Sequence, residues 1–204
     1  LMILYDVFGL PFPKWERKNV ISPEMTEDNG YLVYDIGGGR FDHHFPEEQK
    51  QRREDGTPYA AFGLIVREFH EGFLTQEEYE AFDSSWVKGI DLNDNTGCGN
   101  PAAFEIKCMN PTWDSPNNNT DIRVFTAISK AKDVLEYIIE HIYADCHARE
   151  CAETAVDVAD GCVYLEHYAP IGKYIAPKDG IAFFGFPSNR EIGKYSITSV
   201  KWKG

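Results

Sequence analysis

Apolar residues recur every three or four positions through residues 124–142, which is the spacing of one face of an α-helix. Because side chains at this spacing line a single stripe, we expect them to pack in the core. A further helix is predicted over residues 149–158. The members of the apolar stripe are Val124, Ile128, Ala131, Leu135, Ile138 and Ile142.

Two more helical segments are predicted upstream. Thr57 and Pro58 place a capping residue before a proline at the first helical position, and apolar residues follow at helical spacing. Residues 74–94 have the composition of a second helical stretch, which we expect to be interrupted near residues 83–85. The apolar positions of the first segment are Ala61, Leu64, Ile65 and Phe69.

Shorter apolar runs without helical spacing predict strands. Residues 30–34 form an almost continuous apolar and aromatic run, typical of a strand buried on both faces, and residues 19–25 are a weaker candidate. Residues 1–10 are apolar and stop before Pro11, which predicts the end of a helix. Toward the C-terminus, strand composition with turn residues between the runs occurs in CVYLEHY, GIAFFGFPSN and KYSITSVKW.

The turn-rich stretch DSPNNNTD, residues 114–121, predicts a boundary between two parts of the chain. Strands and helices alternate before it, whereas helices and then strands follow it. We therefore expect an α/β fold in which residues 1–114 form a domain with a mainly parallel sheet. Residues 121–204 are expected to form an α+β C-terminal part.

Composition narrows the classes of function. Hydrophobic residues make up 43% of the 204 residues, so the chain should fold despite a formal net charge of -13. This acidic balance disfavours a broad surface for nucleic acid, because such surfaces cluster lysine and arginine. It is compatible with short single strands or small phosphoesters held by metal ions. No apolar run is as long as a membrane span, and no signal peptide is visible, so we expect no membrane partner.

Cysteine usage indicates the redox environment. The number of cysteines is odd, and no CxxC pair occurs, which fits neither a secreted disulfide framework nor a zinc ribbon. We therefore expect a reducing, cytoplasmic setting. The five cysteines are Cys98, Cys108, Cys146, Cys151 and Cys162.

Candidate metal ligands gather in VYDIGGGRFDHH. Asp35 stands at the C-terminal tip of the predicted strand 30–34, and ligands in open α/β sheets collect beyond such tips. The glycines that follow allow a tight turn. This turn would bring Asp42, His43 and His44 back toward the same edge.

A second acidic motif, GIDLNDNTG, carries Asp91 and Asp94 three residues apart, on one helical face if the preceding helix continues that far. Carboxylates and imidazole together suit Mn²⁺, Fe²⁺ or Zn²⁺ better than Ca²⁺. Asp35, His43 and Asp94 would supply much of the inner shell of one ion. Each motif alone also has a structural interpretation, since Asp35 can form a turn and the acidic pair before Gly97 can end a helix.

These motifs, in this order, resemble the DHH phosphoesterases and, within them, the Myg-type branch, whose members are described as metal-dependent hydrolases or exonucleases. The resemblance covers the chain from about Leu1 to the C-terminus. It implies a DHH-type N-terminal domain. The segments that carry it are VYDIGGGRFDHH, DGTPYAAFGLIVREF, IDLNDNTG and NPTW, with APIGKYI and IAFFGFPSN further on.

The resemblance also implies roles for single residues. Asp35 matches the aspartate that bridges two Mn²⁺ ions. In the Asp-His-His motif, His43 is the implied metal ligand and His44 the catalytic residue that faces the phosphate. Asp42 is expected to orient an imidazole by a hydrogen bond without binding the metal itself.

The fourth motif of the family falls on DLNDN, where Asp94 is the favoured metal ligand and Asp91 a neighbour or substitute. The first motif of the family, which contains histidine and aspartate, has no match in this chain. The segment that the branch carries beyond Val200 is also short here. We therefore expect the protein to continue at both ends. Ile171 stands where the branch usually has tryptophan.

The expected function is that of a Mn²⁺-dependent phosphodiesterase, most specifically a nuclease that cleaves short single-stranded nucleic acid or nucleotides with two metal ions. The alternative is a shortened, non-catalytic member that binds metal, nucleotide or protein. A protein hydrolase lacks support, because the sequence has neither a nucleophile-base pair nor an HExxH helix. The choice between RNA and DNA and the presence of a homo-oligomer stay open.

Overall fold

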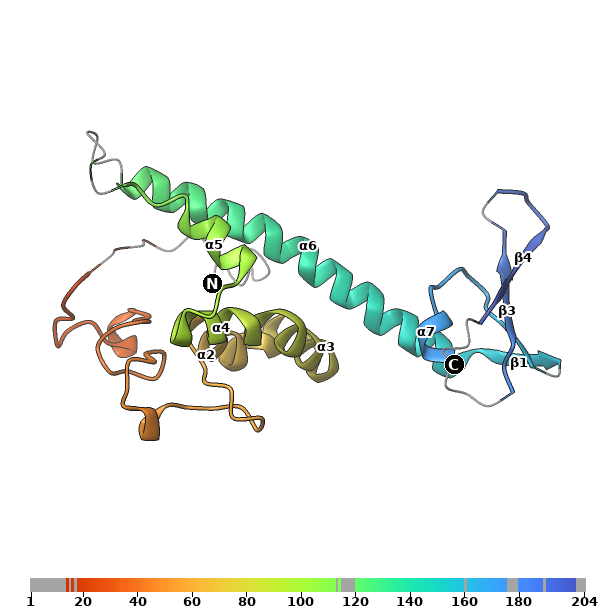
Figure 1. Ribbon diagram of the computed structural model, residues 1–204, viewed down its shortest axis with the longest axis horizontal. Coiled ribbons are helices and arrows are strands. Elements are labelled where there is room, and N and C mark those ends of the chain that lie inside the picture. The colour runs from red at the N-terminus through yellow and green to blue at the C-terminus, as the bar shows by residue number, and fades with distance from the viewer. Residues whose placement is uncertain are drawn as a thin grey trace. The chain divides into compact units, whose positions relative to one another are not determined.

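The computed structural model describes residues 14, 16, 18–112, 114, 120–159, 161–175, 180–188 and 190–200 (Figure 1). The chain forms two compact units, residues 1–139 and residues 140–204. The division between them falls inside helix α6, Thr120–Thr154. The predicted boundary at residues 114–121 lies mostly outside the described residues, as does the predicted helix end at residues 1–10.

Helices form most of the first unit, together with the N-terminal part of α6 (Figure 1). Two short 3-10 turns precede the described helices, and a third follows α2. The α- and π-helical elements are α2 Ala61–Phe69, α3 Gln76–Phe82, η4 Asp83–Val87, α4 Lys88–Thr96 and α5 Pro101–Lys107. The 3-10 turns are η1 Glu27–Asn29, η2 Glu47–Gln49 and η3 His70–Gly72.

The helical stretch from α3 to α4 confirms the helix predicted over residues 74–94, although at residues 83–85 the helix continues in π-helical geometry and is not interrupted. Thr75 and Glu78 form a reciprocal capping box at the start of α3. The five residues of η4 then form a π-helical turn, a feature that often accompanies functional sites. The helix ends at Gly97, which adopts the left-handed conformation at φ 68°.

The start of α2 corrects the prediction from Thr57 and Pro58. The helix begins at Ala61, because the residues before it pair with the preceding chain instead. Arg52 and Pro58 form an isolated antiparallel bridge, and the Tyr59 N–H donates to the Gln51 carbonyl at 2.9 Å. The capping signal at Thr57 therefore predicts a helix start about three residues too early.

The mainly parallel sheet predicted for the N-terminal domain is not found among the described residues of the first unit. Residues 30–34 are not part of a strand, and residues 19–25 contain turns. The segment RFDHH does not form a second strand, although the Asp35 N–H donates to the Phe41 carbonyl at 3.0 Å. A strand needs a neighbour for its backbone hydrogen bonds, so strand-like composition without such a neighbour is not sufficient.

The second unit combines the end of α6 with a small mixed sheet of order β1-β2-β3-β4. The pairs β1–β2 and β3–β4 are antiparallel, and β2–β3 is parallel. The three predicted C-terminal strands are confirmed, whereas the predicted helix 149–158 is the end of α6 followed by β1. The elements are β1 Val156–Ala159, β2 Cys162–Tyr164, α7 Gly172–Ile175, β3 Phe183–Pro187 and β4 Tyr195–Ser199.

Each unit has its own hydrophobic core. In the first unit a cluster forms around Phe41 and α2, and in the second the core lies between the sheet, α7 and the end of α6. Of the apolar stripe predicted along α6, Ile138 is buried and the other members are half-buried. Among the described residues, no helix has both the length and the apolarity needed to cross a membrane.

Candidate metal centre

Asp35 occupies a strained turn that leads into the Asp-His-His motif. Its φ of 63° is the only positive φ of a non-glycine residue in the described part of the chain. The left-handed conformation is costly for residues with a Cβ atom, although aspartate tolerates it better than most. Gly37 and Gly38 continue the turn with φ of 88° and 70°. Strain of this kind tends to persist where a site requires it.

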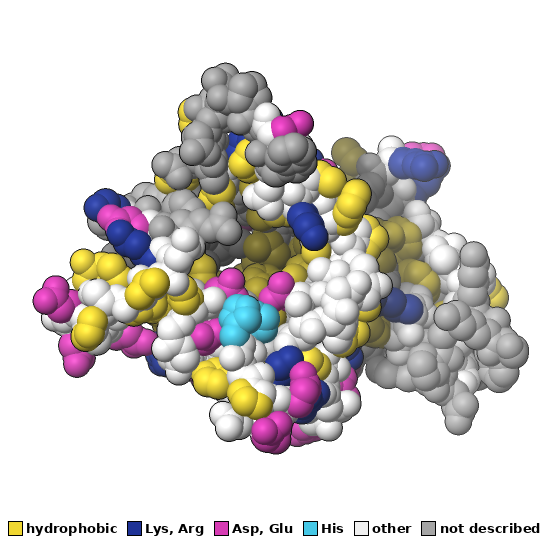
Figure 2. Space-filling view, turned by 60° about the vertical axis from the view of Figure 1, so that its left-hand side comes forward, with side chains coloured by type: hydrophobic (Ala, Val, Ile, Leu, Met, Phe, Trp, Pro, Cys, Tyr) yellow, Lys and Arg dark blue, Asp and Glu magenta, His cyan; other side chains and the backbone are white. Residues whose placement is uncertain are grey.

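His43 lies between two carboxylates. Its Nε2 atom is 3.1 Å from Asp35 Oδ1 and 3.1 Å from Asp94 Oδ2. The His43 side chain is 8% exposed, whereas those of Asp35 and Asp94 are 56% and 54% exposed. The structure therefore brings together three of the predicted site residues, from a loop and from α4. Figure 2 shows histidine and acidic side chains meeting beside a hollow with hydrophobic walls.

Asn95, which the sequence analysis did not single out, contacts the other side of His43. Its Oδ1 lies 3.4 Å from His43 Nδ1. The Asn95 amide nitrogen donates to the carbonyls of Tyr59 and Asp91 at 3.1 Å and 3.0 Å, which defines the orientation of the amide. The only sequence signal for this role is that Asn95 directly follows Asp94 in DLNDN.

The contact with Asn95 bears on which nitrogen of the His43 ring can bind a cation. If His43 Nδ1 donates to the Asn95 oxygen, the neutral ring has only a lone pair at Nε2. That lone pair faces two carboxylate oxygens, an arrangement that is repulsive unless a positive charge lies between them. A proton or a metal ion would satisfy all three groups, and histidine ligands commonly have such an acceptor at the opposite nitrogen.

His44 lies beside this group and is held by Asp42. His44 Nδ1 is 2.8 Å from Asp42 Oδ1 and 4.0 Å from Asp35 Oδ1, and its side chain is 62% exposed. Burial alone would raise the pKa of the Asp42 carboxyl. Hydrogen bonds from the N–H groups of Gly38 and His44 and from the His44 ring outweigh it, so this pKa is lowered. Asp42 thus stays ionised and orients His44.

The His44 ring adds a further possible ligand. One potential ligand atom from each of Asp35, His43 and His44 lies within 4.8 Å of the others, close enough to share one ion. Asp94 approaches the same His43 nitrogen from α4. Carboxylate and imidazole donors suit a divalent ion such as Mn²⁺, Fe²⁺ or Zn²⁺. The residues present therefore fit a metal ion, and the geometry does not select which one.

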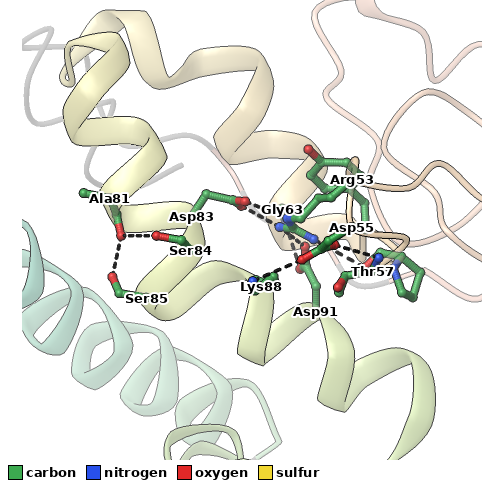
Figure 3. Close-up of polar contacts among 12 residues, drawn as sticks. Arg53, Asp55, Thr57, Gly63, Ala81, Asp83, Ser84, Ser85, Lys88 and Asp91 are labelled. Carbon is green, nitrogen blue, oxygen red and sulfur yellow. Dashed lines mark hydrogen bonds and ion pairs between the residues drawn. The ribbon is translucent and has the colours of Figure 1, made fainter.

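Asp91 is not brought into this group, although it lies only three residues before Asp94. Its side chain is fully buried. Asp91 Oδ2 accepts from Arg53 Nη2 at 2.8 Å, and its Oδ1 accepts from the Gly63 N–H at 3.0 Å (Figure 3). Burial raises the pKa of Asp91 to about 6 even though Arg53 and the Gly63 N–H favour the charged form.

A cavity of about 420 Å³ adjoins the site within the first unit. Asp35 and Asp94 contribute to its wall. Most of the remaining lining is apolar and includes Tyr34, Phe62 and Phe82. A ligand bound at the carboxylates could therefore extend an uncharged group into this space.

No protein-family model matches the chain, and no solved structure matches it. The chain is 29% identical over 208 residues to the MYG1 protein of Chlamydia muridarum, covering 92% of this chain and 65% of that protein. It is 28% identical over 174 residues to the MYG1 protein of Chlamydia trachomatis, covering 76% of this chain and 56% of that protein.

A MYG1 protein of Chlamydia pneumoniae is 28% identical over 140 residues, covering 66% of this chain and 46% of that protein. The chain thus spans between about half and two thirds of the length of these curated relatives. It is similar to proteins named MYG1 protein along most of its own length.

Proposed function

We propose that the chain belongs to a MYG1-type member of the DHH phosphoesterases and contributes to a metal-dependent phosphodiesterase. The observation that carries this proposal is the position of His43 Nε2, 3.1 Å from carboxylate oxygens of both Asp35 and Asp94. The sequence motifs and the similarity to the chlamydial relatives support the same assignment.

In this proposal Asp35, His43 and Asp94 hold a divalent ion such as Mn²⁺. When bound, such an ion polarises a phosphoryl oxygen and lowers the pKa of bound water. Asn95 keeps His43 oriented through its Nδ1 atom. Asp42 holds His44 through Nδ1 at 2.8 Å, so that the exposed ring, when it carries protons on both nitrogens, can also donate a hydrogen bond to the substrate phosphate. The whole protein is proposed to use two ions, with Asp35 shared between them.

The proposed substrate is a short single-stranded nucleic acid or a nucleotide. The net charge of -13 disfavours extended contact with a phosphate backbone, so the metal would have to supply the local attraction. The mostly apolar cavity beside Asp35 and Asp94 offers space for an uncharged part of such a ligand.

Metal uptake tests the proposal directly. Protein purified without chelator is analysed for Mn, Fe, Co and Zn, and metal-free protein is titrated with Mn²⁺. We expect binding, with the largest loss in Asp35→Asn, because Asp35 is the ligand that is proposed to serve both ions. Asp28→Asn, an exposed aspartate in η1, is the matched control and should bind as the wild type does.

Activity is then measured by hydrolysis of bis(p-nitrophenyl) phosphate with Mn²⁺. Metal-dependent hydrolysis that is lost in Asp35→Asn supports the phosphodiesterase. Uptake of metal without hydrolysis of this diester or of a short oligonucleotide would favour the non-catalytic binding module. The absence of any metal uptake would contradict both the metal centre and the enzyme.

A further inference from the structure

A buried charge cluster lies next to the candidate metal centre and is made of Arg53, Asp83 and Asp91 (Figure 3). Their side chains are 7%, 14% and 0% exposed. Arg53 donates from Nε and Nη2 to the two oxygens of Asp83, each at 2.6 Å, and from Nη2 to Asp91 at 2.8 Å. The planar fork of arginine makes this geometry directional.

The cluster reaches His43 through two contacts of Asn95. Asn95 donates to the carbonyl of Asp91, one turn earlier on α4, and to the carbonyl of Tyr59. The Arg53 guanidinium contacts both of these residues, since it pairs with Asp91 and lies 4.0 Å from the centre of the Tyr59 ring. Arg53 therefore contacts the side chains of both residues whose backbone carbonyls orient the Asn95 amide facing His43.

Gly63 shows how closely α2 must approach this cluster. A Cβ atom at position 63 would lie 1.8 Å from Asp91 Oδ2 and 3.0 Å from Arg53 Nη2. Any larger residue would have to displace the Asp91 carboxylate from its bond with the Gly63 N–H. Glycine is thus required here by contact with another helix rather than by its own backbone conformation.

Stability alone is a weak reason for such a cluster. One guanidinium is buried with two carboxylates, and the desolvation of charges offsets much of their attraction, so apolar packing would stabilise the fold at least as well. What the charged groups provide in addition is a single geometry. Here that geometry determines where α4 and the Tyr59 segment lie.

We infer that the Arg53–Asp91 pair, together with Gly63, positions the candidate metal centre by setting the place of Asn95, and hence of His43. The pair is a positioning element and not a ligand. The inference depends on the proposed function only for the presence of a metal at His43, because the placement of the His43 ring can be measured without metal.

The test compares two glycine-to-alanine variants. Gly63→Ala displaces Asp91, whereas Gly89→Ala, on α4 itself, would place its Cβ 3.4 Å from the Asn100 side-chain nitrogen and no closer to any other atom. Two properties are measured on folded protein: the Mn²⁺ dissociation constant and the ¹⁵N signals of the His43 ring without metal. We expect Gly63→Ala to weaken Mn²⁺ binding about tenfold or more and to shift the His43 signals, and Gly89→Ala to change neither.

Asp91→Asn serves as the second variant, because it keeps the size of the side chain and decides the question if Gly63→Ala does not fold. Thermal unfolding is recorded for each variant. If the variants lower the melting temperature but leave the His43 signals at their wild-type positions, the cluster is only structural and the inference is wrong. If the wild type binds no Mn²⁺, the proposed function fails, and the His43 signals alone decide the inference.

Discussion

Two aspartates on α4 lie three residues apart, but their carboxylates face different partners. Asp91 is fully buried and pairs with Arg53, a cation that the fold itself supplies. Asp94 is 54% exposed and faces His43 together with Asp35. In the described part of the chain, neither Asp35 nor Asp94 pairs with a lysine or an arginine. Asp91 with Arg53, the closed group, is neutralised by a cation of the protein itself. Asp94 with Asp35 and His43, the open group, is suited to a cation from solution.

The difference is one of desolvation. Burying Asp91 carries an energetic cost that Arg53 has to offset, so removal of either partner leaves an uncompensated charge in the interior. The carboxylates of Asp35 and Asp94 remain largely hydrated in the fold, so they cost little without a ligand. Neighbouring aspartates on one helix can therefore serve structure and binding separately.

The largest expected effect is on the closed group. Arg53→Met should lower the free energy of unfolding by about 3–5 kcal/mol, because Asp83 and Asp91 lose their common cation. Urea unfolding measures this change. Arg52→Met is the matched control, since Arg52 forms an exposed ion pair with Glu47 and its loss should cost at most about 1 kcal/mol. Equal effects of the two substitutions would show that the buried cluster is not held by charge.

The closed group should also make stability depend on pH. Burial raises the pKa of Asp91 from 3.8 to about 6, so the folded state binds this proton more tightly than the unfolded state does. The contribution of Asp91 is therefore fully present below about pH 4 and is lost as the pH rises through 6, by about 1–3 kcal/mol.

The side chain at position 91 in the variant Asp91→Asn cannot titrate. The free energy of unfolding of the wild type should therefore fall relative to that of the variant as the pH rises from 4.5 to 6.5. Urea unfolding at several pH values measures the difference. A shift of opposite sign would mean that Arg53 lowers the pKa of Asp91 more than burial raises it.

Substitutions around the open group should change the affinity for metal. Asn95→Ala removes the acceptor for His43 Nδ1, and we expect Mn²⁺ affinity to fall about 10- to 100-fold. Asn100→Ala provides the contrast, because Asn100 caps α5 through the Ala103 N–H and should affect stability without affecting metal. Calorimetric titration with Mn²⁺ distinguishes them. Unchanged affinity in Asn95→Ala would separate Asn95 from the site.

The smallest effect on metal binding is expected for His44→Ala. His44 is oriented by Asp42, and we assign it to the substrate, so its loss should change Mn²⁺ affinity by less than about tenfold. His43→Ala should weaken Mn²⁺ binding by more than this under the same conditions, because His43 Nε2 faces the carboxylates of both Asp35 and Asp94. If both variants lose metal equally, His44 is a ligand together with Asp35 and His43, which the short distances among the three also permit.

The sequence predicted those parts of the fold that depend on local pattern. The helical stretch from α3 to α4 and the strands β2, β3 and β4 followed from composition and from the turn residues between the runs. The N-terminal parallel sheet did not follow, because an apolar run such as residues 30–34 indicates a strand but not its hydrogen-bonding neighbour. Helix α2 began later than its capping signal because residues 51 to 59 pair with each other first.

For the candidate site, the sequence by itself determined which side chains could contribute, since Asp35, His43 and Asp94 were identified from their residue types and order. The strand that was expected to carry Asp35 is not found among the described residues. The resemblance favoured Asp94 over Asp91 as a ligand, but only the tertiary structure gives a physical reason for separating them. The spacing of three placed both on one helical face, but Arg53, 38 residues before Asp91, pairs with Asp91 and not with Asp94. The tertiary structure likewise revealed the role of Asn95, whose side-chain amide is oriented by its hydrogen bond to the Tyr59 carbonyl. Periodicity is a property of the local chain, whereas the charge that each carboxylate meets is decided by which distant segment packs against it.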